Sequence, residues 1–391
     1  MAGGFLAQML ALAELRRAWL RVCANGGKPG GDGISLATFA ARLESELAQL
    51  RREVAAGKYR PRPMLGLTIV KSGGGRRELA IPSVRDRVLQ TAFAQALSPI
   101  LEPQFEPCSY AYRPGRSIRM AAEAVLCAHR AGLIWTVDAD IDQFFDNITH
   151  SRLLECLRPF LSDTGALGLL QSWLGADLLK FGELRRLIRG LPQGSPLSPL
   201  LSNLYMDAFD ESLEAQGQTL IRYADDFVLL CRGREDARRG LQSARLALAS
   251  LDLSLNEEKT RIANFQSGLD FLGVHFVEPT NGGPLLATSP HPALLPAYRL
   301  ETVMHENETL PKEETGLLND TATTDTAEPV EPLLRSLYVT GHGSRLGIAG
   351  ERFVVKPLDE DEHEVPALKV DQIILFGHVQ ASTQALGESA L

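Results

Sequence analysis

The sequence has 391 residues, 45% of them hydrophobic, and a formal net charge of −8. This length favours two units joined by a connector over one compact domain. No apolar run approaches the roughly 20 residues of a membrane span, and five scattered cysteines without C-x-x-C spacing argue against a disulfide framework or a zinc site. The N-terminus also lacks a basic, cleavable leader. We therefore expect a cytoplasmic protein without membrane contact.

The charge is distributed unevenly along the chain. From Glu278 onward there are 7 basic and 18 acidic residues, whereas the part before it carries 33 and 30. The mildly basic front part is compatible with a phosphate-bearing partner. Residues 278–333 are rich in Pro, Thr, Glu and Asp, which predicts an acidic, low-complexity linker. Strand-like runs return in residues 334–391, which indicates a small β-rich domain.

The front part alternates helical and strand-like patterns, which predicts an α/β (α+β) fold. The helices are expected within residues 1–60 (one of them at 35–56), at 84–101 and 117–131, from 150 onward, up to 210 after a loop that begins at 190, and at 235–250. The strands are expected at 65–70, 77–81, 134–141, 220–224 and 227–231, with two short elements around 253–262 and 271–276.

Two groups of aspartates stand out among the predicted strands. Asp138, Asp140 and Asp142 alternate along one strand-like segment, and Asp225 and Asp226 lie at a predicted hairpin turn. Alternation puts the first group on one face of its strand, where three carboxylates would repel one another without a cation. Two divalent cations held by such carboxylates suit nucleotidyl transfer, because charge builds on both the attacking and the leaving oxygen. An Asp-Asp pair alone is more often a solvated turn.

Several further motifs occur in a fixed order with these aspartates. They are IVKSGGGRRELAIPSVRDRVLQ, SYAYRPGRS, DADIDQFFDNI, GLPQGSPLSPLLSNLYMD, IRYADDFVLL, LNEEKTRI and FLGVHF. Together they resemble the reverse transcriptases of group II introns, over roughly residues 15–277. The resemblance implies a right-hand polymerase fold with fingers and palm in residues 1–277, and RNA-directed DNA synthesis from dNTPs on an RNA template and DNA primer.

The same resemblance assigns roles to single residues. Asp140, Asp225 and Asp226 become the catalytic metal ligands, with Ile141 beside them in the metal site, for two Mg²⁺ ions that Mn²⁺ could replace. Phe145 corresponds to an aromatic gate that rejects the 2′-hydroxyl of ribonucleotides. Without the resemblance, Phe145 reads as an ordinary core aromatic.

Basic and polar residues complete the implied nucleotide pocket. Lys71, Arg77, Gln193 and Lys259 match positions that contact the incoming nucleotide, and the lysine of NEEKTRI is proposed to protonate the leaving pyrophosphate. Arg113 and Arg116, in SYAYRPGRS, are expected to contact the nucleic-acid backbone. Each of these alone is more often a solvated side chain.

The last segment carries a second resemblance. LYVTGHGSRLGIAGERFVVK and EVPALKVDQIILFGHVQASTQAL look like the N-terminal β-rich domain of the CRISPR-associated integrase. This implies a role in spacer acquisition, with CRISPR array DNA, integrase protomers and a small adaptation subunit as partners. The integrase metal ligands lie beyond this segment, so no integrase activity is expected here. We expect either a fragment of a longer fusion or a segment that serves only for docking. We also expect that the helical thumb of group II enzymes does not follow FLGVHF.

Two other functions compete with the polymerase hypothesis. The chain could be a non-catalytic adaptor that binds nucleic acid for the integrase. The three intact aspartates argue against this, because an inactive site does not need them. It could also be an intron or retron enzyme without a CRISPR role. The triplet Val339-Thr340-Gly341 matches a retron motif but falls in the β-rich segment, which favours coincidence.

Overall fold

The structure is a computed structural model that describes residues 4–70, 76–279 and 285–289, together with six short strands between 336 and 381. Its helices are α1 (Phe5–Met9), α2 (Leu12–Asn25), α3 (Leu36–Ala40), α4 (Leu43–Ala55), α5 (Val84–Leu101), α6 (Ile118–Arg130), α7 (Phe144–Asn147), α8 (His150–Leu157), α9 (Thr164–Leu174), α10 (Ser198–Ala215) and α11 (Arg234–Ser250), with 3₁₀ turns η1 (Glu102–Gln104) and η2 (Phe265–Ser267). The described part of the chain contains no helix long and apolar enough to cross a membrane. The predicted mixed α+β class is confirmed.

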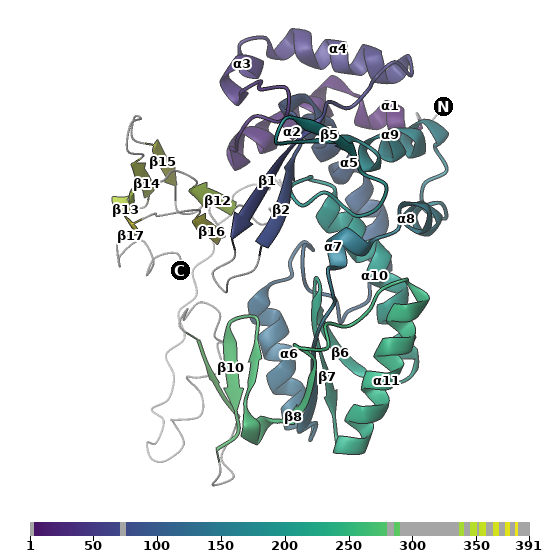
Figure 1. Cartoon of the computed structure of the whole chain (residues 1–391), viewed down its shortest axis with the longest axis vertical. Coiled ribbons are helices and arrows are strands. Elements are labelled where there is room, and N and C mark those ends of the chain that lie inside the picture. Colours follow the sequence, from purple (N-terminus) through teal and green to yellow (C-terminus); the bar gives the residue numbers. More distant parts are fainter. Residues whose placement is uncertain are drawn as a thin grey trace, which may run out of the picture.

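One four-stranded sheet, which we call the palm sheet, forms the centre of the lower part in Figure 1. Its order is β6-β7-β3-β8, with bounds Thr219–Tyr223 (β6), Asp226–Cys231 (β7), Trp135–Asp140 (β3) and Arg261–Asn264 (β8). Figure 1 shows α6 against one face and α10 and α11 against the other. Alternation along β7 matches this sandwich, because Val228 and Leu230 pack toward α6 while Leu229 packs with the larger core on the opposite face.

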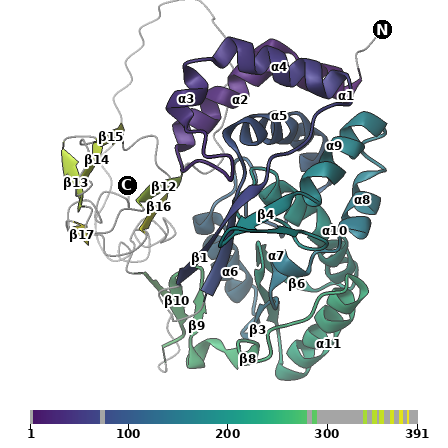
Figure 2. The same ribbon diagram turned by 45° about the horizontal axis from the view of Figure 1, so that its top comes forward.

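A second sheet lies between the palm sheet and the N-terminal helices, as Figure 2 shows. Its order is β2-β1-β4-β5, with bounds Arg76–Ile81 (β2), Met64–Val70 (β1), Asp177–Lys180 (β4) and Glu183–Arg186 (β5). The predicted hairpin corresponds to β1 and β2, whereas β4 and β5 are additional strands. After residues 187–189, which follow β5, the chain enters the GLPQG segment (residues 190–194). The strands β4 and β5 therefore determine where this segment begins.

Three further sheets follow the palm sheet along the described part of the chain. The strands β9 (Leu269–Phe271), β10 (Val274–Val277) and β11 (Leu286–Thr288) form one, in the order β11-β10-β9. The strand β11 lies inside the predicted linker 278–333, and the later part of that linker lies outside the described residues. The C-terminal strands are β12 (Ser336–Val339), β13 (Arg345–Ala349), β14 (Arg352–Lys356), β15 (His363–Pro366), β16 (Gln372–Leu375) and β17 (Gln380–Ala381), in the orders β12-β16 and β15-β14-β13-β17.

Helix bounds follow local signals closely in some places. Ser83 accepts a hydrogen bond from Asp86 N and so caps α5, whose bounds equal the predicted 84–101. The single helix predicted over 35–56 is instead two helices, α3 and α4. The turn between them allows Phe39 to pack against Trp19, with ring centroids 5.1 Å apart. Burial of that aromatic pair outweighs helix continuity here.

One half-buried carboxylate makes the stability depend on pH. Asp207 on α10 has an oxygen that is buried without a hydrogen-bond partner. Burial, followed by the charges of Asp210, Glu211 and Glu106, raises the pKa of Asp207 from 3.8 to about 7. Because the folded state holds this proton more tightly than the unfolded chain, the free energy of unfolding falls as pH rises from about 4 through 7.

We therefore expect Asp207→Asn to raise the melting temperature at about pH 8 and to flatten its decline between about pH 5 and pH 8. The amide resembles the protonated carboxyl group and needs no ionisation. The matched control is Asp177→Asn on β4, an exposed position. Thermal unfolding followed by circular dichroism checks this, and an unchanged pH slope in the Asp207 variant would contradict it.

Candidate active site

The aspartates of the palm sheet meet at one end of two adjacent strands. β3 and β7 are antiparallel, and their register sets Asp140 directly opposite Asp226. The turn before β7 brings in Asp225, whose carbonyl oxygen accepts a hydrogen bond from Ile141 N at 3.3 Å. Asn256 N donates to the Asp140 carbonyl at 2.8 Å from the other side. The backbone therefore places the four residues predicted for the metal site at the same end of the palm sheet.

The electrostatics of this cluster are unfavourable without a cation. Partial burial of its carboxyl group, followed by the charges of Asp225 and Asp140, raises the pKa of Asp226 to about 7. The side chain nevertheless remains accessible from solvent. A carboxylate is thus held near two others in a place where a small ion can still reach it.

Two basic side chains neutralise part of the charge on β3. Lys259 Nζ contacts Asp140 Oδ2 at 2.7 Å, and this hydrogen bond and the nearby carboxylates raise the pKa of Lys259. Arg261 Nε contacts Asp138 Oδ2 at 2.9 Å. Asp138 is thereby paired on the strand, whereas Asp142 lies past its end, where its N donates to Ser254 O at 2.9 Å. Asp140 is the member of this alternating group that faces the Asp225–Asp226 pair.

The donor chemistry fits a divalent cation. Mg²⁺ binds through a few carboxylate oxygens and keeps the rest of its shell for water and substrate phosphate. Asp140, Asp225 and Asp226 supply such oxygens. The pKa of Asp226 is raised first by burial and then by the charges of Asp225 and Asp140, and a cation would offset both effects. Across the described ranges, no three His, Cys, Asp or Glu side chains are already gathered closely enough to hold a metal. The Lys259 ammonium is instead placed against Asp140.

Phe145 lies just beyond the aspartates on α7. Its ring is half-buried and meets Phe144 edge-on, with centroids 5.2 Å apart. The Phe145 carbonyl accepts a hydrogen bond from Leu191 N at 2.7 Å, and Gly190 N donates to Ile148 O at 2.8 Å. The segment that follows β5 therefore fixes the backbone of the predicted gate, a connection that the sequence does not reveal.

Gln193 follows two residues later in the same segment. Its carbonyl accepts a hydrogen bond from Ala80 N at 2.9 Å, which ties it to β2. Gly194 has φ +127°, and a Cβ there would come within 2.7 Å of the Ala80 carbonyl oxygen. The close approach of the two backbones explains the glycine in PQGSP. Gln193 is half-buried beside β2.

The basic residues predicted near β1 and β2 and in the SYAYRPGRS loop have different surroundings. Arg77 lies on β2 opposite Ile69, and Lys71 falls outside the described residues. Arg116 is half-buried, donates to the Pro107 carbonyl at 3.1 Å and lies over the Tyr110 ring.

Arg113 differs from the prediction of a nucleic-acid contact. It is buried, and its guanidinium donates to Glu102 Oε1 at 2.8 Å and to the carbonyls of Phe105, Glu106 and Ser109. These contacts hold the SYAYRPGRS loop together and leave the guanidinium inside the protein. The geometry gives Arg113 a structural role.

Comparisons with known proteins agree with both resemblances. Residues 69–276 match the family model "Reverse transcriptase (RNA-dependent DNA polymerase)", and residues 337–390 match "CRISPR associated protein Cas1". The two matches follow each other in the predicted order along the chain. They confirm a group II intron-like polymerase segment joined to a Cas1-like segment.

Individual relatives cover the chain to different extents. Protein YkfC of Escherichia coli K12 is 33% identical over 63% of this chain and 74% of its own length. The group II intron-encoded protein LtrA of Lactococcus lactis subsp. cremoris is 26% identical over 59% of this chain and 49% of its own length. A chain of the solved Cas6-RT-Cas1--Cas2 complex is 22% identical, with 99% of this chain and 38% of that chain covered and a TM-score of 0.40. This chain thus spans about half of LtrA and less of the solved chain.

Proposed function

Because the chain belongs to the reverse transcriptase (RNA-dependent DNA polymerase) family, we propose that it copies an RNA template into DNA by two-metal nucleotidyl transfer. The observation that carries this proposal is the register of β3 and β7, which sets Asp140 opposite Asp226 with Asp225 beside them. Divalent cations bound there would supply the positive charge that stabilises the attacking and leaving oxygens.

Residues of the chain itself would bind the cations and transfer a proton. Asp140, Asp225 and Asp226 provide carboxylate oxygens, with the Ile141 backbone next to them. The Lys259 ammonium is close enough to this cluster to reach a triphosphate and give a proton from Nζ to the leaving pyrophosphate oxygen.

The nucleotide pocket is completed from the fingers and from α7. Lys71 and Arg77 bind triphosphate oxygens, Gln193 lines the pocket, and the Phe145 ring excludes a 2′-hydroxyl. Support for the last two comes from the GLPQG segment, which contacts both β2 and the Phe145 backbone. We also propose that Arg116 contacts the nucleic-acid backbone.

The Cas1-like segment gives the synthesis a biological setting. We propose that the chain acts in CRISPR spacer acquisition, with integrase protomers, a small adaptation subunit and array DNA as partners. The match of residues 337–390 to the Cas1 family supports this. The predicted domain division, with a linker at 278–333, is part of the same proposal.

Primer extension tests the polymerase activity. A labelled DNA primer is annealed to an RNA template or to a DNA template of the same sequence, and the chain is added with dNTPs and Mg²⁺. We expect extended DNA on the RNA template, and no product when EDTA removes the cation. Binding to the duplex without extension on either template would overturn the proposal and favour the non-catalytic adaptor.

A further inference from the structure

The buried side chain of Arg222 lies three residues before Asp225 and is not a member of the carboxylate cluster. Arg222 is 1% exposed and its partner Asp210, on α10, is 0% exposed. All five guanidinium N–H groups have acceptors. The acceptors are Asp210 Oδ1 for Nε (2.7 Å), Asn203 Oδ1 (3.2 Å) and Ala224 O (3.1 Å) for Nη1, and Ser109 Oγ (2.8 Å) and Asp210 Oδ2 for Nη2.

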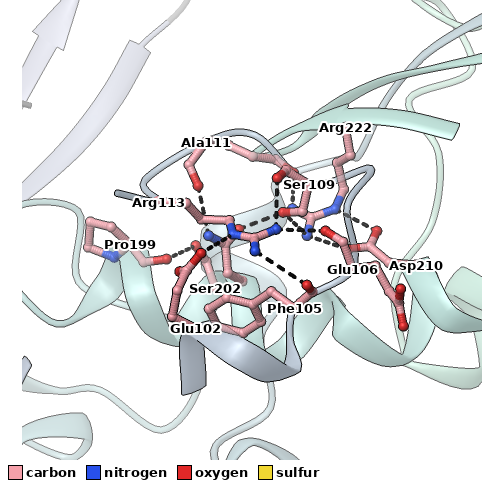
Figure 3. A network of polar contacts seen from close by, with 12 residues as sticks. Glu102, Phe105, Glu106, Ser109, Ala111, Arg113, Pro199, Ser202, Asp210 and Arg222 are labelled. Atoms are coloured by element: carbon pink, nitrogen blue, oxygen red, sulfur yellow. Dashed lines mark hydrogen bonds and ion pairs between the residues drawn. The ribbon is translucent and has the colours of Figure 1, made fainter. Parts of the chain in front are cut away.

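These acceptors belong to three separate segments of the chain. Asn203 and Asp210 are on α10, Ser109 is in the SYAYRPGRS loop, and Ala224 is in the turn that precedes β7. Figure 3 shows the Arg222 guanidinium between Ser109 and Asp210, with Arg113 on the other side of Ser109. The backbone adds to this, because Arg222 N donates to Cys108 O at 2.8 Å and Tyr110 N donates to Arg222 O at 2.9 Å.

The bond to Ala224 links the network to the carboxylates. Ala224 has φ +60°, a left-handed conformation that is unfavourable for a residue with a Cβ. Its carbonyl orientation determines where the next peptide, and hence Asp225 and Asp226, is directed. A guanidinium fork can hold this carbonyl while it stays bidentate to Asp210, which an ammonium cannot do.

A stabilising role alone does not explain a fully buried ion pair. The desolvation of two charges largely offsets their attraction, and apolar residues of similar volume often serve stability equally well. The geometric specificity of a five-donor fork is what apolar packing could not supply at this turn.

We propose that Arg222 is a positioning residue that sets Asp225 and Asp226 opposite Asp140 by holding the Ala224 carbonyl. This rests on the proposed function, because it concerns the same carboxylate site. Arg222 touches neither substrate nor the reacting atoms and acts through the turn. The result is a turn whose backbone positions Asp225 and Asp226 before any cation binds.

The test compares Arg222→Lys with Arg113→Lys. Both variants replace a buried arginine of the same network, but Arg113 pairs with Glu102 and does not contact Ala224. Three quantities are measured in the full chain: the Kd for Mn²⁺ by electron paramagnetic resonance of the free ion, the melting temperature, and the Mg²⁺ concentration for half-maximal DNA synthesis.

We expect both variants to lower the melting temperature, whereas Arg222→Lys alone raises the Mn²⁺ Kd and the Mg²⁺ requirement, each by about tenfold. Equal metal constants in the unchanged chain and in both variants would overturn the inference. If Arg222→Lys does not fold, Asp210→Asn replaces it. The amide keeps an oxygen that accepts from Arg222 Nε, but it no longer accepts from Nη2. The same direction of change in the Mn²⁺ Kd supports the inference, and no change overturns it.

The outcome separates this inference from the proposed function. If the unchanged chain synthesises DNA and binds Mn²⁺ while Arg222→Lys matches it, the inference fails and the function stands. If the unchanged chain binds Mn²⁺ but makes no DNA, the polymerase proposal fails and the metal constants still decide the role of Arg222. If it binds no Mn²⁺, both fail together.

Discussion

Asp226→Asn is expected to lower the rate of DNA synthesis by about a thousandfold or more, equivalent to about 4 kcal/mol of lost transition-state stabilisation. The amide has nearly the same shape but carries no charge, so it binds a divalent cation weakly. Because Asp226 lies directly across from Asp140, the substitution leaves Asp225 as the only carboxylate of the pair that faces Asp140. Single-turnover primer extension measures the effect.

Asp138→Asn is the matched control for this prediction. Asp138 is on the same strand as Asp140, two residues earlier, but it pairs with Arg261 rather than with the opposite carboxylates. We expect its rate to stay within about twofold of the unchanged chain, because its carboxylate is paired with Arg261 and does not belong to the cluster. A similar loss of rate in both variants would show that general charge loss on β3 is responsible, and not the cluster.

Phe145→Ala is expected to reduce the preference for deoxyribonucleotides over ribonucleotides by about a hundredfold, which is the scale of steric discrimination in a pocket. The half-buried ring lies on α7, directly after the strand that bears Asp140, and its backbone is fixed by Leu191 N. Removing the ring leaves space for a 2′-hydroxyl. The ratio of kcat/KM for dNTP and rNTP incorporation measures this.

The neighbouring ring provides a control for the gate. Phe144 is 2% exposed and packs into the core, so Phe144→Leu should lower the melting temperature without changing nucleotide preference. Selectivity that changes equally in both variants would contradict the assignment of Phe145. If neither variant changes nucleotide selectivity, Phe145 is an ordinary core aromatic, as the sequence indicates without the family resemblance.

The local patterns that predicted most of the fold are strong ones. α5 is capped by Ser83 and is mainly apolar. Along β3 polar and apolar residues alternate toward the aspartates, whereas β7 is continuously apolar after Asp226. The strands β4 and β5 carry no such signal. All four side chains of β5 are exposed, including two arginines, and four residues are too few for a period to appear. Its pairing depends on β1, more than 100 residues earlier, through β4.

The site was predictable where the chemistry is carried by residue type. Carboxylates at one strand end and a hairpin turn indicate a cation site, and the register brings them together. The role of Arg222 was not predictable, because a single arginine in a strand has no pattern and its acceptors come from three distant segments. The prediction that Arg113 contacts nucleic acid was wrong because its sequence context does not show its partners. Glu102 and three backbone carbonyls hold the guanidinium inside the protein.

Metal-directed cleavage locates the cation without depending on activity. Fe²⁺ replaces Mg²⁺ in the full chain, ascorbate and peroxide are added, and the cut peptides are identified by mass spectrometry. We expect cuts next to residue 140 and next to residues 225 and 226, all suppressed by excess Mg²⁺ and lost in Asp226→Asn. Cuts that fall elsewhere, or that persist unchanged in this variant, would contradict a shared metal site on the palm sheet.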